Sequence, residues 1–130
     1  MKDYSKLIQA ARQAIDKGFY ANAEPYRKYG AAVLIQGGNI YSAGQYSSFN
    51  HITSVHAEMA AVIAATMNGE PEITALALAS NVGEGCFSCG VCLQFLKEHC
   101  MRTGIDMDVI YAGDKWEEIH KISKLTEKMW

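Results

Sequence analysis

The alternation of apolar and polar positions predicts that helices and strands follow one another along this chain. Over residues 4–15 the apolar side chains recur at helical spacing, and Gly18 follows as a C-terminal stop. Two short apolar runs, over 31–35 and 40–43, flank a pair of glycines. This spacing predicts that a β-hairpin follows the first helix.

The second half of the chain continues the alternation. Residues 54–67 are apolar nearly all round and rich in alanine, which is typical of a helix buried on several sides. Strands are predicted over 75–79 and 107–111, and a helix over 89–100 lies between them. A hairpin followed by helix, strand, helix and strand is typical of a mixed sheet with helices on both faces, so the predicted fold class is α/β.

Two segments have weaker patterns. Residues 44–55 are polar and irregular and lead into the alanine-rich helix, which fits a substrate-binding loop and an ordinary surface loop equally well. The tail alternates only partly from Trp116 onward, and Ser123 is a suitable residue to start a helix. We therefore expect a weak strand and then a short helix at the end of the chain.

The composition limits the classes of protein to which the chain can belong. With 49% hydrophobic and 20% charged residues, residues 1–130 are expected to form one soluble, packed domain. The net charge of −2 and the lack of a basic stripe argue against nucleic acid as a partner. No apolar run approaches the roughly 20 residues of a membrane span, and the start lacks the pattern of a signal peptide. We therefore expect a cytoplasmic protein.

The sulfur chemistry of the chain is concentrated in one segment. Its four cysteines are Cys86, Cys89, Cys92 and Cys100. In a reducing compartment such clustering is typical of metal binding or thiol redox chemistry rather than of structural disulfides. We interpret Cys86 as a bystander thiol, with a ligand or resolving role as the alternative, and Cys100 as a core residue.

A histidine completes a metal-ligand set with two of these cysteines. His56 lies at the start of one predicted helix, and Cys89 and Cys92 lie at the start of another. Zinc binds imidazole nitrogen and thiolate sulfur in tetrahedral geometry, and a catalytic site uses three protein ligands so that water can take the fourth position. The N-terminus of a helix stabilises thiolates through its dipole and free N–H groups. The pattern predicts one zinc ion per chain.

Glu58 supplies the acid–base group that such a site needs. It lies two residues after His56, roughly 200° around a helix, so the two side chains are not expected to bind one metal in the same way. A carboxylate near activated water can carry a proton to a ring nitrogen and then to a departing amine. Zinc nucleobase deaminases carry HxE followed by PCxxC. This chain has HAE followed by SCGVC, so only the proline is missing.

On these motifs the chain resembles the cytidine deaminase superfamily, and within it the small cytidine deaminases and blasticidin S deaminase. The stretches PYRKYGAAVL and GGNIYSAG resemble the first two core strands of that family, and CGVCLQFL resembles its CGxCRQ helix. The resemblance implies a three-layer αβα fold with a mixed sheet of about five strands, assembled as a homotetramer or homodimer. It also implies that His56, Cys89 and Cys92 bind zinc and that Glu58 is the catalytic proton shuttle.

The chain departs from the small cytidine deaminases at two places. Those enzymes typically show CAER and CGxCRQ, whereas here a thiolate and two arginines are replaced together by His56, Met59 and Leu93. A neutral imidazole leaves no excess negative charge for the arginines to offset. The positions of the family's ribose-binding Asn and Glu hold Gln45 and Ser47, which lack the carboxylate. The expected substrate is therefore a free cytosine-type nucleoside or a related small heterocycle.

Six further residues are candidates for substrate contact. Aromatic side chains can stack on a heteroaromatic ring, and Phe49 is the preferred candidate for this role. The candidates are Tyr26, Gln45, Ser47, Phe49, Ala57 and Trp130. His51, His99 and His120 stand apart from the ligand motifs, so we interpret them as ordinary polar residues.

Three alternative functions stay open beside the cytidine-type deaminase. A blasticidin S-type deaminase would apply the same chemistry to a different small molecule. A thiol–disulfide module would explain a strand that leads into the CGVC motif, and a non-catalytic zinc protein would explain the ligands without turnover. Neither of the last two needs Glu58, so deamination is the preferred interpretation.

Overall fold

The chain folds around one mixed sheet of five strands, in the order β2-β1-β3-β4-β5. The computed structural model describes residues 2–21, 27–82, 87–113 and 117–128. The strands are β1 (Tyr29–Ile35), β2 (Ile40–Gly44), β3 (Ile73–Ser80), β4 (Asp108–Ala112) and β5 (Glu117–Lys121). Strands β3 and β4 are parallel, and the other neighbouring pairs are antiparallel.

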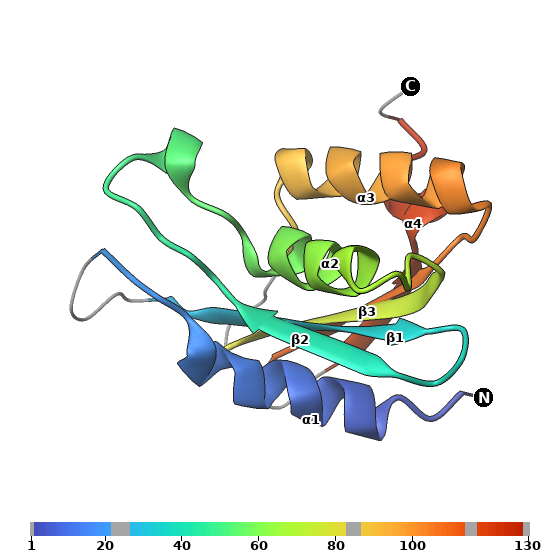
Figure 1. Cartoon of the computed structure of the whole chain (residues 1–130), viewed down its shortest axis with the longest axis horizontal. Helices are drawn as coiled ribbons and strands as arrows, with labels where there is room; N and C mark the ends of the chain where they lie inside the picture. Colours follow the sequence, from blue (N-terminus) through green and yellow to red (C-terminus); the bar gives the residue numbers. More distant parts are fainter. Residues whose placement is uncertain (1, 22–26, 83–86, 114–116, 129–130) are drawn as a thin grey trace.

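Helices cover both faces of this sheet (Figure 1). The helical elements are α1 (Ser5–Ala14), η1 (Ile15–Lys17), η2 (His51–Thr53), α2 (Ala57–Met67), α3 (Gly90–Thr103) and α4 (Ile122–Leu125). Helix α1 lies on one face, whereas α2 and α3 lie side by side on the other. The α/β class and the three-layer arrangement expected from the sequence are confirmed.

The central strand β3 separates two buried clusters. Its large side chains, Leu76 and Leu78, belong to the cluster formed with α2 and α3. Its alanines, Ala75, Ala77 and Ala79, belong to the cluster formed with α1. This alternation follows from the two-residue period of a strand, and the small side chains let α1 approach the sheet closely. Strand β3 is therefore buried on both faces and gives the site a rigid support.

The structure corrects the boundaries of two predicted helices. The alanine-rich helix begins at Ala57 rather than at residue 54, because His56 is extended, with φ −71° and ψ 152°, and forms the N-cap. The helix predicted over 89–100 runs on to Thr103. It ends where Gly104 adopts a left-handed conformation, with φ 76°, which glycine accepts without steric cost.

The tail forms the expected strand and short helix. Strand β5 pairs with β4, although Trp116, where the pattern begins, lies outside the described residues. The helix begins at Ile122 rather than at Ser123. The Ser123 hydroxyl donates to Asp106 Oδ2 at 2.6 Å, and its N–H donates to Asp106 Oδ1 at 3.0 Å. Ser123 therefore ties α4 to the segment before β4 instead of capping the helix.

The irregular segment after β2 is held by backbone pairing. Tyr46 and Val55 exchange two hydrogen bonds, of 2.9 and 2.8 Å. On the other side, Phe19 N–H donates to the Gln45 carbonyl, and Ser47 N–H donates to the Phe19 carbonyl. Residues 45–47 thus form the middle of a small pleated ribbon, with Phe19 on one side and Val55 on the other, and the chain continues from this ribbon into α2.

Gly30 sets the distance between α1 and the sheet. A Cβ atom at this position would lie 2.2 Å from the Ala11 carbonyl oxygen and 2.5 Å from the Ile15 nitrogen. Both are backbone atoms, so no side-chain rotation can relieve the contact. Strand β1 therefore needs glycine where it passes under the end of α1.

Gly30→Ala is expected to lower the free energy of unfolding by about 3 kcal/mol, because the added methyl group forces helix and sheet apart. Urea unfolding followed by circular dichroism measures the change. Gly37→Ala is the matched control, since a Cβ atom there meets nothing within 4 Å. An equal loss of stability in both variants would contradict this interpretation of Gly30.

Candidate active site

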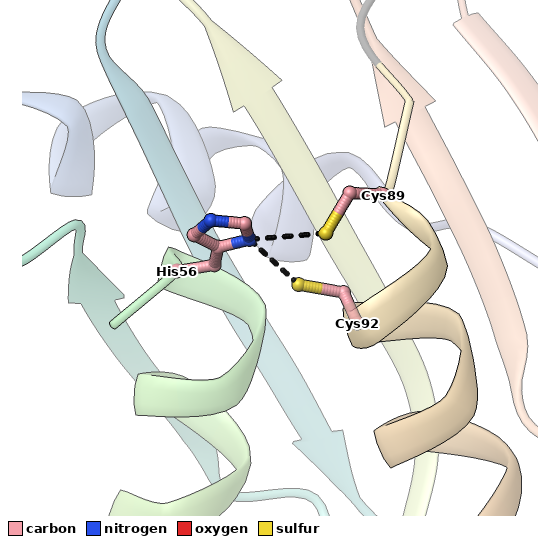
Figure 2. Close-up of side chains that lie close together, drawn as sticks. All are labelled: His56, Cys89 and Cys92. Carbon is pink, nitrogen blue, oxygen red and sulfur yellow. Dashed lines mark hydrogen bonds between the residues drawn. The ribbon is translucent and has the colours of Figure 1, made fainter. Parts of the chain in front are cut away.

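His56 lies at the N-terminus of α2 and is held there by backbone bonds on both sides. The preceding Val55 is paired with Tyr46, and the His56 carbonyl accepts the Ala60 N–H at 3.0 Å. The imidazole projects from this extended residue toward α3 (Figure 2). Glu58, in the first turn of α2, is only 4% exposed.

Two candidate thiols come from the first turn of α3. Cys89 is the N-cap residue, and its carbonyl accepts the Leu93 N–H at 2.9 Å. Cys92 lies almost one turn further and is buried, whereas Cys89 is exposed. Figure 2 shows both sulfur atoms beside the His56 ring. The N-termini of α2 and α3 therefore meet at one point, where their dipoles favour negative charge.

The three ligand atoms lie close enough to hold a single cation. His56 Nδ1 is 3.0 Å from Cys92 Sγ and 3.3 Å from Cys89 Sγ. All three atoms lie within 4.8 Å of one another. In a tetrahedral zinc site, neighbouring nitrogen and sulfur ligands are roughly 3.5 to 3.8 Å apart. A shift of about half an ångström would open the cluster to that geometry, so the donor set fits zinc.

The electrostatics of the cluster also favour a bound cation. Burial raises the pKa of the Cys92 thiol, and the nearby Glu58 carboxylate and Cys89 raise it further. Reactive thiols of redox modules have lowered pKa values instead. A zinc ion would supply the positive charge that holds Cys92 as a thiolate, so the cluster fits a metal centre better than a free dithiol.

A cavity of about 140 Å³ lies beside the cluster. It is lined by Tyr29, Gln45, His56, Glu58, Leu78, Phe87 and Cys89. The buried carboxylate and two of the three ligand residues thus open onto the same space, together with the amide of Gln45. Among these lining residues Glu58 is the sole carboxylate and there is no lysine or arginine, so the wall suits a small neutral ring.

The structure places the other substrate candidates in different surroundings. Ser47 and Phe49 line a second cavity, of about 310 Å³, whose wall also includes Phe19 and Tyr46. Phe49 is 94% exposed, whereas Ala57 is buried in the main core cluster. Tyr26 and Trp130 lie outside the described residues. Gln45 is therefore the one described candidate that lines the cavity at the cluster.

The pairing of Tyr46 with Val55 places Gln45 beside His56. Successive residues of a strand point to opposite faces. Tyr46 and its partner Val55 therefore share one face, while Gln45 and His56 share the other. Tyr46 packs on Phe19, with ring centroids 5.4 Å apart, and both residues line the second cavity.

Tyr29 and Phe87 line the cavity and were missed by sequence reasoning. Tyr29 begins β1, within the PYRKYGAAVL stretch, and Phe87 lies two residues before Cys89. Phe87 is 61% exposed although it forms part of the cavity wall. The available signal was the presence of an aromatic residue immediately before the SCGVC motif.

The other histidines and cysteines have separate surroundings. His99 Nε2 lies 2.8 Å from the Pro71 carbonyl oxygen, and His120 Nε2 lies 3.2 Å from a glutamate carboxylate of its own strand. Cys100 belongs to the main core cluster, as the sequence predicts. Cys86 lies outside the described residues. Within the described residues, the candidate metal cluster is therefore limited to His56, Cys89 and Cys92.

Comparisons with known proteins identify a family and similar folds. The family model of the cytidine and deoxycytidylate deaminase zinc-binding region matches residues 1–105. The fold is similar to that of cytidine deaminase from Burkholderia pseudomallei, with a TM-score of 0.81 and 20% identity over 95% of this chain and 96% of that chain. For cytidine deaminase from Mycobacterium tuberculosis the TM-score is 0.77, with 22% identity over 98% and 97% of the two chains. No curated protein sequence matches the chain.

The fold and the clustered ligand residues define the class as a deaminase-type domain with a zinc-binding region. Because the family model covers most of its length, the chain belongs to the cytidine and deoxycytidylate deaminase family. The superfamily expected from the HAE and SCGVC motifs is thereby confirmed. At 20% to 22% identity, the similarity to solved structures shows the fold alone. None of the helices in the described ranges is both long and apolar enough to cross a membrane.

Cys92→Ala is expected to abolish stable zinc binding, because two remaining ligands do not complete a zinc site. Purified wild-type protein should carry about one zinc ion per chain after desalting, measured by plasma mass spectrometry. Cys100→Ala removes another buried thiol of α3 and should keep the metal. Zinc retained by Cys92→Ala, or lost from Cys100→Ala, would contradict the assignment.

Proposed function

We propose that the chain is a zinc-dependent hydrolytic deaminase that releases ammonia from the exocyclic amine of a free cytosine-type nucleoside or a related small heterocycle. The observation that carries this proposal is the position of Glu58, a buried carboxylate that lines the same cavity as His56 and Cys89. A structural zinc site is closed by its ligands, and a redox dithiol needs no carboxylate beside it. A hydrolytic site needs both an open space and a proton carrier.

Each residue of the cluster has a task in this reaction. His56, Cys89 and Cys92 would hold zinc, which supplies the Lewis acidity that brings the pKa of water toward neutrality. Glu58 accepts a proton from the attacking water and delivers it to the ring nitrogen beside the amine-bearing carbon. Glu58 then carries the second proton to the departing amine, so a carbonyl replaces the carbon–nitrogen bond and ammonia leaves.

The lining of the cavity, which has no lysine or arginine, supports a small uncharged heterocycle as substrate. The Gln45 amide can both donate to and accept from the polar edge of a ring, and Phe87 offers an aromatic surface. Ser47 stands where the small cytidine deaminases carry a ribose-binding carboxylate. Contacts to a ribose hydroxyl must therefore differ from theirs, which keeps a blasticidin S-type substrate as the alternative.

We propose further that the protein is a cytoplasmic homo-oligomer, either a tetramer or a dimer. Ile63 and Met67 on α2 are exposed apolar side chains beside a groove of about 340 Å³ that also contains residues of α3. A second copy on this face would remove them from water. Cys89 and Cys92 must stay reduced to bind metal, which a reducing compartment ensures.

Glu58→Gln is expected to lower kcat at least about 100-fold with zinc still bound, because an amide cannot carry a proton. Ammonia release is measured with cytidine, deoxycytidine, cytosine, blasticidin S, adenosine and guanine. Glu72→Gln removes an exposed carboxylate that is not among the residues lining the cavity and is the control. Equal kcat values for wild type and Glu58→Gln would contradict the assigned role. Zinc-bound wild type without turnover would favour the non-catalytic zinc protein.

Phe87→Ala is expected to raise KM for the best substrate about 10-fold, because stacking of a base on an aromatic ring is worth about 1–3 kcal/mol. Phe87→Tyr keeps the ring and should leave KM near the wild-type value. Phe49→Ala tests the aromatic residue that the sequence favours. A raised KM in Phe49→Ala with an unchanged KM in Phe87→Ala would assign the stacking role to Phe49.

A further inference from the structure

Tyr111, on β4, contacts the segment that leads into the first turn of α3. Its side chain is 1% exposed. Its hydroxyl accepts the Ser88 N–H at 3.2 Å, and its ring meets the Phe87 ring edge to face, with centroids 5.3 Å apart. One buried side chain therefore touches both residues that directly precede Cys89.

The hydrogen bond to Tyr111 is possible because residue 88 is not proline. Zinc nucleobase deaminases carry proline directly before the first cysteine of the CxxC motif. Proline has a fixed φ and no N–H. Here Ser88 holds that position, so an N–H is present and needs an acceptor. In the part of the chain that the structure describes, Ser88 Oγ is buried without a partner, so the serine hydroxyl does not hold the segment.

Tyr111 is itself firmly placed in the sheet. It is the register partner of Leu78 in the parallel pair of β3 and β4, and Leu78 lines the cavity at the cluster. The His120 ring of β5 packs against it at a centroid distance of 6.0 Å. A hydrogen bond donated to such a residue ties the segment before α3 to the sheet.

We propose that Tyr111 is a positioning residue of the metal centre, which restrains the Phe87–Cys89 segment by a hydrogen bond where the PCxxC motif uses proline. It acts through Ser88, whose placement directs Cys89 toward His56. The inference rests on the proposed zinc site. Partners of this kind set metal affinity because they orient the ligands.

The first test is the zinc affinity of Tyr111→Phe, which keeps the ring and removes the hydroxyl. Competition with a chromogenic chelator is expected to show an affinity about 10- to 100-fold below wild type. With cobalt in place of zinc, the absorption bands of the cobalt–thiolate site are expected to shift, because Cys89 meets the metal in a changed geometry.

Tyr41→Phe is the matched control for this measurement. It also removes a phenol that makes a hydrogen bond, in this case to Glu70, beyond the C-terminal end of α2 and away from His56. Its zinc affinity and cobalt spectrum should equal those of wild type. Equal losses of affinity in Tyr41→Phe and Tyr111→Phe would overturn the proposal, as would wild-type affinity and spectrum in Tyr111→Phe.

Ser88→Pro provides the rescue that a merely structural role would not allow. Proline restrains the segment without an N–H, so zinc affinity should stay within about threefold of wild type. Adding Tyr111→Phe to Ser88→Pro should then cost no further affinity, whereas independent effects would add. If Tyr111→Phe fails to fold, Ser88→Pro alone still decides. A loss of affinity of about 10-fold or more in that variant would overturn the proposal.

Metal affinity and turnover are separate measurements, so the two proposals can fail separately. Wild-type protein that binds zinc but deaminates no compound would contradict the proposed function, and the affinities of the variants would still decide the role of Tyr111. Wild-type protein that binds no zinc would overturn both.

Discussion

The site depends on the meeting of two helix N-termini above the buried strand β3. Once ionised, the two thiols concentrate negative charge there together with the buried Glu58 carboxylate, and burial, Glu58 and Cys89 all raise the pKa of the Cys92 thiol. The dipoles of α2 and α3 offset part of this charge. A divalent cation would offset the rest, and a neutral imidazole as third ligand avoids adding to it. The negative charge of the cluster would therefore be compensated by the two helix N-termini and a bound cation together.

The sheet supplies the rigidity that this balance needs. On β3, large side chains face α2 and α3 and alanines face α1, so each helix layer packs at its own distance. Gly30 lets α1 approach β1 closely on the opposite side from the site. Leu78 at the cavity wall and its register partner Tyr111 are both buried in this packed sheet.

The segment between β2 and α2 contributes residues to two cavities, one beside the metal-ligand cluster and one beside Phe19. Its pleat directs Gln45 and His56 toward the cavity and Tyr46 toward Phe19. A shift of one residue in this pairing would exchange the two faces, because the side-chain period of a strand is two. The register of Tyr46 with Val55 is therefore a structural condition for placing His56 beside the thiols.

The sequence by itself determined the α/β class and the order of the elements, because periodicity is a local property. Its motif spacing also singled out His56, Glu58, Cys89 and Cys92, which the structure brings to one place. The predicted start of the alanine-rich helix at residue 54 was too early, because His56 is extended although the apolar pattern continues there. Only the tertiary structure decided which wall residues face the cavity and that a strand residue, Tyr111, holds Ser88. Those contacts depend on strand pairing and register between distant segments, which local patterns do not encode.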